Sequence, residues 1–375
     1  MNDRVQRGTG KMTILYYFRK LNTPMYMWQI YHIVDELAHY NCRVDVFNPD
    51  EYDSVDEANE KVIKKLQTTR YDLFMTCHNE SLLYPMTLQQ IKKAGIPTVL
   101  FCPDNLVVPF NHQRVAPLFD LVWLTSHETE YLFKRWGCKT VVLPYAANPF
   151  FLKPNFQQNE RLCVGFIGTP HGSRIDRINK MLDSGIPLCV HTKADAFAPK
   201  LVSAPISSYL NVLRDSIRYP IGVKLAYASV IDKLKHRNLH TDSPYLHREN
   251  VIPLEELANK NCEYALVLAF TEANSTGVLR NPVPIVNLRN FEIPMSGGLQ
   301  ITRYTDELAS YFENDKEIIL CKDDEEFKEK ALFYLEPQND TLRLKMKIAA
   351  RERAEKEHTW MRRFEVAFHE LGLKG

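Results

Sequence analysis

Apolar runs and amphipathic stretches alternate regularly along the first half of the chain. Six runs fit buried strands: TILYYF from Thr13, CRVDVF from Cys42, YDLFMTC from Tyr71, IPTVLFC from Ile96, LFDLVWL from Leu118 and CKTVVL from Cys138. Between them the apolar residues recur at helical spacing, for example over residues 28–37 and 55–69. Strand and helix in strict alternation predict an α/β domain with a parallel, doubly wound sheet over residues 12–150.

The same alternation starts again after a polar, proline-containing linker over residues 148–160. Strand-like runs begin at Arg161 (RLCVGFIG), Ile186 (IPLCVHT), Cys262 (CEYALVLAF) and Leu299 (LQIT). We therefore predict a second Rossmann-like domain over residues 161–358. From Asp324 the pattern is helical almost to the last residue, with a bend near His358, and residues 359–375 form a separate closing helix.

The stretch from Asn287 to Phe327 is the most informative part of the second domain. Arg289, Phe291 and Glu292 lie in a short predicted helix that Ser296-Gly297-Gly298 ends, as glycine commonly does. The apolar LQIT follows as a strand, and Thr305 caps the next helix. Carboxylates near such strand ends face the usual ligand edge of an open α/β sheet.

Composition narrows the class of protein. A length of 375 residues suits two domains, and the net charge of +1 gives no overall attraction to nucleic acid or to anionic membranes. The eight cysteines form no C-x-x-C pairs and predict buried free thiols in a reducing compartment. No apolar run is long enough to span a bilayer and no signal peptide is evident, so we expect a cytoplasmic protein, with a flexible lead over the first eleven residues.

Four motifs in order give the C-terminal half a specific resemblance. They are R-x-F-E-x-x-x-x-G-G from Arg289 to Gly298, K-E-I from Lys316, D-x-E-E-F from Asp323 and H-T-x-x-x-R from His358 to Arg363. Together they resemble GT-B glycosyltransferases of the CgeB-like (spore maturation protein, glycosyl transferases group 1) family. The resemblance implies two Rossmann-like domains facing across a cleft and a last helix that crosses back to the N-terminal domain. It also implies an N-terminal acceptor domain and a C-terminal nucleotide-sugar domain.

For the nucleotide, the resemblance assigns Glu292 to the ribose hydroxyls, which one carboxylate can accept as a pair. The alternative is a helix glutamate that pairs with Arg289. Gly297 and Gly298 either cap the helix or let the backbone approach the donor. Both readings stay open at this stage.

The diphosphate has a candidate site in the turn from Gly165 to Arg174. Gly168, Thr169 and His171 follow a strand and precede a helix, whose first amides, with Arg174, can meet an anion. The turn lacks the G-x-G-x-x-G fingerprint, which disfavours a nicotinamide cofactor. Arg280 and Lys224 are further phosphate candidates, and each reads equally as a solvated side chain.

A base for the acceptor hydroxyl is expected at the strand ends of the first domain. The candidates there are His78, Glu80, Asp104, His127 and Glu128. Asp104 matches a position where the family commonly carries an aspartate and is placed first, with His78 second. An isolated histidine after a strand is more often an ordinary hydrogen-bonding residue.

Residues 196–240 interrupt the alternation and carry seven cations against two acids. They are either a solvated basic helical insertion or a contact for the acceptor or a membrane surface, which would make the protein peripheral at the inner face of the membrane.

Two motifs that are absent from the sequence limit the mechanisms that it predicts. Many retaining GT-B enzymes have E-x7-E, but the position of the first glutamate is Pro284, so the stereochemical outcome is open. The sequence has no D-x-D and no zinc spacing, so we expect a metal-independent transferase without a cofactor. It would move a sugar from a UDP- or GDP-type donor to a glycan, lipid-linked or protein acceptor, with no nucleic acid polymer as partner. The alternatives are a sugar-nucleotide epimerase of GT-B architecture and a non-catalytic nucleotide- or glycan-binding protein.

Overall fold

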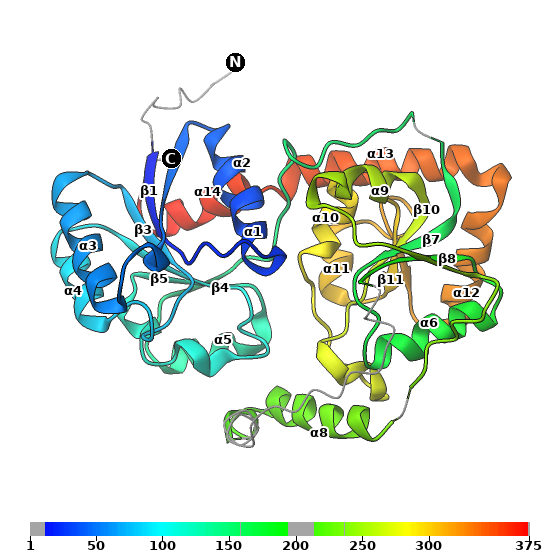
Figure 1. Ribbon diagram of the computed structural model, residues 1–375, viewed down its shortest axis with the longest axis horizontal. Helices are drawn as coiled ribbons and strands as arrows, with labels where there is room; N and C mark the ends of the chain where they lie inside the picture. The colour runs from blue at the N-terminus through cyan, green and yellow to red at the C-terminus, as the bar shows by residue number, and fades with distance from the viewer. Residues whose placement is uncertain (1–11, 158, 194–213, 236, 374–375) are drawn as a thin grey trace, which may run out of the picture. The chain divides into compact units, whose positions relative to one another are not determined.

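The computed structural model describes residues 12–157, 159–193, 214–235 and 237–373 (Figure 1). The expected lead over residues 1–11 and the first part of the basic insertion, with Lys200, lie outside these ranges. The chain divides into two compact units. The first unit runs up to Phe151 and resumes at Thr359, and the second unit is Leu152–His358.

The first unit is built on a six-stranded parallel sheet in the order β2-β1-β3-β4-β5-β6. Its strands are β1 (Met12–Tyr17), β2 (Cys42–Phe47), β3 (Leu73–Thr76), β4 (Thr98–Cys102), β5 (Leu121–Leu124) and β6 (Thr140–Val142). The central strands are buried along their whole length, which is why they read as continuous apolar runs. All six strands predicted for this half are confirmed in the predicted order.

The helices of the first unit follow the strands they connect. They are α1 (Pro24–Gln29), α2 (Asp35–Ala38), α3 (Val55–Thr68), α4 (Pro85–Lys93), α5 (Glu130–Arg135) and α14 (Trp360–Glu370), with 3-10 turns at Pro49–Glu51, Pro109–His112, Ala116–Leu118 and His127–Thr129. A π-helical turn, Ile30–Val34, joins α1 to α2. The helix predicted over residues 28–37 is therefore present, but it is wound less tightly in its middle.

Helix α14 completes the core of the first unit. Trp360 is fully buried and its ring lies 5.8 Å from Trp28, 5.9 Å from Phe101 and 6.0 Å from Trp123. Glu36 of α2 accepts a hydrogen bond of 2.7 Å from the backbone N–H of Met361, in the first turn of α14, where the amides have no acceptor within the helix. The last helix of the chain thus belongs to the unit that the chain forms first.

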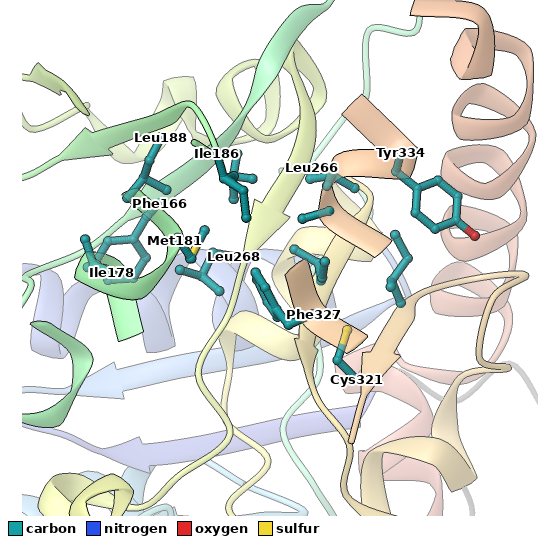
Figure 2. Close-up of a cluster of buried hydrophobic side chains, with 14 of the residues drawn as sticks. Phe166, Ile178, Met181, Ile186, Leu188, Leu266, Leu268, Cys321, Phe327 and Tyr334 are labelled. Carbon is teal, nitrogen blue, oxygen red and sulfur yellow. The ribbon is translucent and has the colours of Figure 1, made fainter. Parts of the chain in front are cut away.

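The second unit has a six-stranded parallel sheet in the order β12-β11-β10-β7-β8-β9. Its strands are β7 (Arg161–Ile167), β8 (Leu188–His191), β9 (Leu246–Glu249), β10 (Tyr264–Leu268), β11 (Gln300–Arg303) and β12 (Ile319–Cys321). Side chains alternate across β7, so that Val164 and Phe166 pack on one face and Cys163 on the other. Figure 2 shows the larger of these two clusters.

Helices cover both faces of the second sheet. They are α6 (Ser173–Asp183), α8 (Pro220–Leu234), α9 (Leu257–Glu263), α10 (Arg289–Met295), α11 (Asp306–Tyr311), α12 (Asp324–Leu335) and α13 (Asp340–Glu357), with 3-10 turns at Leu254–Glu256, Asn274–Val278 and Pro337–Asn339. Residues of α6 and α12, such as Met181 and Phe327, share the larger core cluster, and Ile293 of α10 packs on the opposite face.

The predicted caps of the central stretch are confirmed. Gly297 has a φ of +74°, and the N–H of Gly298 donates to the carbonyl of Ile293 at 2.9 Å, a hydrogen-bonding pattern that ends a helix. The hydroxyl of Thr305 accepts from the N–H of Leu308 at 3.1 Å. The bend near His358 is also present, because α13 ends at Glu357 and α14 begins at Trp360.

All eight cysteines are free thiols, and seven of them are buried. Within the described part of the chain, no helix combines the length and the apolar character needed to cross a bilayer.

Candidate functional site

The strand order of the second unit creates a topological switch point between β7 and β10. From β7 the chain moves outward through β8 and β9, and from β10 it moves in the opposite direction through β11 and β12. The loops that follow β7 and β10 therefore leave the sheet toward opposite sides. A crevice at the carboxyl ends of such strands is the usual ligand site of an open α/β sheet.

A pocket of about 230 Å³ lies at this edge. It is rich in charged side chains, with five cations and three acids among its lining residues. The lining consists of Ser173, Arg174, Asp176, Arg177 and Lys180 from α6, Phe270, Glu272, Asn274, Gly277, Leu279 and Arg280 after β10, Arg303 at the end of β11, and Asp324 at the start of α12.

Two arginines of α6 stack on one aromatic ring in the lining of the pocket. Arg174 and Arg177 are three positions apart, so they share a face of the helix. Their guanidinium carbons lie 5.2 Å and 5.7 Å from the ring centroid of Phe270. Such stacking fixes the position of a guanidinium group while its N–H groups remain able to donate.

Ion pairs neutralise part of this positive charge. Arg177 contacts Glu272 at 2.5 Å, and Asp324 lies between Lys180 at 2.6 Å and Arg303 at 3.3 Å. No carboxylate of the described ranges lies within ion-pair distance of Arg174 or Arg280.

Burial lowers the pKa of Arg174, an effect that the charge of Glu272 opposes, but a guanidinium group keeps its proton throughout the physiological range. The pocket therefore presents two arginines to an anionic ligand, with Arg177, Lys180 and Arg303 beside them.

The glycine-bearing turn before α6 has a packing role in the structure. The N–H of Gly168 donates to the carbonyl of His191 at 3.1 Å, and a Cβ atom at Gly172 would lie 2.7 Å from the carboxylate of Asp232. Thr169 and His171 are exposed. Of the residues predicted in this turn, only Arg174 lines the pocket.

Glu292 is buried in the first turn of α10, and its carboxylate lies 3.0 Å from the guanidinium group of Arg289. A Cβ atom at Gly297 would lie 2.7 Å from Phe156, and one at Gly298 would lie 3.0 Å from the carbonyl of Asn261, so protein atoms occupy the space beside both glycines. None of these four residues lines the pocket.

The two further phosphate candidates, Arg280 and Lys224, lie in different parts of the second unit. Arg280 lines the pocket, whereas Lys224 is exposed on α8 and does not. The structure thus brings Arg174 and Arg280 together and leaves the other predicted donor residues elsewhere in the second unit.

The two predicted catalytic residues follow adjacent strands of the first unit. His78 comes after β3 and Asp104 after β4. The Nε2 atom of His78 accepts a hydrogen bond of 2.9 Å from the backbone N–H of Arg19, and the ring stacks on Phe18. Burial, with the nearby charges of Arg19 and His112, lowers the pKa of His78 to about 4. The ring is therefore neutral, and its only lone pair is already used, which argues against a role as base.

Asp104 is exposed at the start of a largely buried turn, and desolvation by the surrounding protein raises the pKa of its carboxyl group. A carboxylate with a raised pKa is a better proton acceptor than an ordinary one. Of the two candidates, the geometry favours Asp104.

Sequence reasoning missed several pocket residues, namely Phe270, Glu272, Arg177 and Arg303. A usable signal was present, because Arg177 lies one turn after Arg174 and Arg303 directly follows the predicted strand LQIT. Glu272 follows a run of apolar residues, YALVLAF, at the position where a parallel strand turns toward its ligand edge. Over the described ranges no group of three or more histidine, cysteine or carboxylate side chains is arranged to hold a metal ion.

Comparison with known proteins gives a family match for part of the second unit. Residues 229–368, a little over a third of the chain, match the family model described as "Glycosyl transferase-like". A search of curated proteins gave no significant match. The family match does not distinguish the CgeB-like group, which stays a prediction.

Solved structures resemble the chain over nearly its whole length. HepE from Anabaena, in complex with UDP and glucose, has 14% identity and a TM-score of 0.55, with 96% of this chain and 100% of that chain covered. Sucrose-phosphate synthase from Thermosynechococcus elongatus has 12% identity and a TM-score of 0.54, with 96% and 99% covered. An α-glucosyltransferase in complex with UDP and a 13-mer DNA has 12% identity and a TM-score of 0.57, with 97% and 100% covered. At such identities the likeness shows the fold, which is GT-B as predicted.

Proposed function

We propose that the protein is a glycosyltransferase that moves a sugar from a nucleoside-diphosphate sugar to an acceptor hydroxyl group. The observation that carries the proposal is the arginine-lined pocket at the switch point between β7 and β10. Glycosyl transfer develops negative charge on the leaving diphosphate, and fixed cations stabilise that charge in the transition state. Arg174 and Arg280 are the residues proposed to meet it.

The other roles follow from the same chemistry. Glu292 is proposed to accept the ribose hydroxyls of the donor, and Asp104 to accept the proton of the acceptor hydroxyl. We propose UDP as the first nucleotide to test, because two of the three similar structures described above hold UDP. We propose that the cationic side chains of the pocket supply the positive charge in place of a metal ion, so that chelators leave the activity unchanged.

Calorimetric titration with UDP, GDP and UDP-sugars tests this proposal. We expect one nucleotide diphosphate to bind, and Arg174→Ala and Arg280→Ala each to weaken that binding by about tenfold to a hundredfold, since each removes a charge-assisted contact. Arg248→Ala, an exposed arginine on β9 of the same unit, is the matched control. If no nucleotide diphosphate binds the native protein, the proposal is wrong.

Product analysis separates the transferase from its alternatives. An epimerase converts the donor sugar in a reaction without any acceptor, whereas a transferase releases the nucleotide diphosphate when an acceptor is present. A protein that binds the nucleotide but neither releases nor epimerises the sugar is a non-catalytic binding protein.

A further inference from the structure

Helix α8 turns an apolar stripe toward solvent. Val223, Tyr227, Val230 and Leu234 are 50%, 61%, 58% and 75% exposed. Their spacing of four, three and four residues places all four on one narrow face of the helix. Ile217, just before the helix, is also 65% exposed. A row of large apolar side chains on a single helix face is unusual for a surface that meets only water.

The opposite face of α8 is anchored to the second unit, so the stripe has a fixed direction. Leu225 and Ala228 are buried there. The carboxylate of Asp232 accepts hydrogen bonds from Ser275 at 2.9 Å and from Arg237 at 2.7 Å. Since Asp232 is nearly diametrically opposite the stripe in helical projection, these contacts keep Tyr227 and Leu234 outward. Figure 1 shows α8 at the margin of its unit.

Positive charge borders the stripe on both sides. Lys224 and Lys233 lie about a quarter turn from it in opposite directions, and both are exposed. Arg214, Arg218 and Lys235 add exposed cations near the helix ends, whereas the two acids of residues 214–235, Asp215 and Asp232, are both half-buried. An outward apolar stripe between rows of lysine is the pattern of a helix that lies in the plane of a membrane surface.

We propose that this surface, which we call the α8 ridge (residues 214–235), docks the protein on an anionic lipid bilayer. The apolar stripe would enter the interface between headgroups and acyl chains, and the flanking cations would meet anionic headgroups. A second copy of the chain fits less well, because a paired ridge would bring the same cations against each other. The stripe also projects from a single helix and does not line a groove. It therefore fits a flat lipid surface better than it fits a bound peptide.

This inference is independent of the proposed transferase activity. Its test measures lipid binding alone, so a failure of either proposal leaves the other standing. If both hold, an acceptor in or near the membrane becomes the first class of acceptor to examine.

Vesicle flotation tests the proposal directly. The full chain is mixed with vesicles of phosphatidylcholine, with or without phosphatidylglycerol. We expect it to float with the anionic vesicles only and to be released by added salt, because screening weakens attraction between exposed charges. A triple variant, Tyr227→Ser with Val230→Ser and Leu234→Ser, and a double variant, Lys233→Glu with Lys235→Glu, should each bind about tenfold or more weakly.

Matched controls separate the ridge from general surface effects. Met86→Ser, Val108→Ser and Tyr131→Ser replace three exposed apolar residues of the first unit and should leave flotation unchanged. Thermal melting by circular dichroism should give the same Tm for every variant, since only exposed side chains change. Flotation that is absent in the wild type, equal on uncharged vesicles or retained by the triple variant overturns the proposal. Concentration-dependent dimers that the triple variant abolishes would also overturn it.

Discussion

The carboxylate of Glu272 lies 2.5 Å from the guanidinium group of Arg177, with 7% and 14% of the two side chains exposed. This ion pair lies in the lining of the proposed diphosphate pocket. Breaking a buried pair from one side leaves an uncompensated charge, which is more destabilising than never having had the pair. We therefore expect Arg177→Met to lower the free energy of unfolding by about 3 kcal/mol and to weaken nucleotide binding, since Glu272 then repels the diphosphate.

The matched change is Glu272→Gln, which keeps the shape of the side chain and removes its charge. It leaves Arg177 uncompensated and raises the positive potential of the pocket, so nucleotide affinity should hold or rise. Denaturant unfolding and calorimetry on both single variants and the double variant measure the coupling. Purely additive losses in the double variant would show that the pair does not act as a unit.

Substitution of Glu292 separates ligand binding from helix stabilisation. We expect Glu292→Ala to weaken nucleotide binding by about tenfold or more while the protein stays folded, because a ribose diol would lose its charged acceptor. Arg289→Ala is the matched change, since it removes the other partner of the 3.0 Å ion pair. Calorimetry gives affinity and thermal melting gives stability. If the two variants lose equal stability and neither loses nucleotide affinity, Glu292 only pairs with Arg289 and does not bind the nucleotide.

The strand-end residues of the first unit should differ in kinetic effect. Asp104→Asn removes the proposed base and should lower kcat by about 10²- to 10⁴-fold. His78→Gln keeps an acceptor for the N–H of Arg19 and should change kcat little. Because the pKa of Asp104 is raised, the wild-type rate should fall, as pH drops, at a higher pH than an ordinary aspartate would give. A His78→Gln variant as slow as Asp104→Asn would reverse the assignment.

Glu36 should make the first unit less stable as pH rises. Burial raises the pKa of Glu36 to about 8, against opposing hydrogen bonds from the backbone of Met361 and Trp360. The folded state therefore holds a proton that the unfolded state loses near the ordinary glutamate pKa of 4.5. Stability falls between these two values as pH increases. Unfolding followed at several pH values should show this slope in the wild type and a weaker slope in Glu36→Gln, and an unchanged slope would contradict the assignment.

Substitution of Gly297 tests whether close packing, in addition to the backbone conformation, requires glycine at this helix end. Its φ of +74° disfavours any L-residue by roughly 1–2 kcal/mol, and an added Cβ atom would lie 2.7 Å from Phe156. Gly185 of the same unit has a φ of +76°, but its added Cβ atom would meet Tyr245 at an ordinary 3.5 Å. Gly297→Ala should therefore lower the free energy of unfolding more than Gly185→Ala does. Equal losses would mean that Phe156 moves aside freely.

The pattern of apolar runs predicted all six strands of the first sheet and four of the second, because buried parallel strands are apolar on both faces, but it missed the short edge strand β12. It also missed β9, the opposite edge strand, whose sequence LHRE is largely polar and only partly buried. Helix α8 was predicted only as part of a basic insertion. Its apolar residues face both the protein and the solvent, so no single amphipathic stripe marks it in the sequence.

The site was harder to predict than the fold. Arg174 was found because it follows a glycine-bearing turn, and Arg280 because it is a cation in a polar loop. Glu272 and Arg303 line the same pocket because the strand order places the ends of β10 and β11 side by side. That proximity depends on tertiary structure, and no local spacing encodes it.

The insertion of Trp360 among Trp28, Phe101 and Trp123 has a consequence for biosynthesis. A ribosome delivers the three inner rings long before it delivers the tryptophan that covers them. Until then the nascent first unit has an open apolar face, and it is available to chaperones while the second unit folds. A premature stop after His358 would therefore damage the end of the molecule that was translated first.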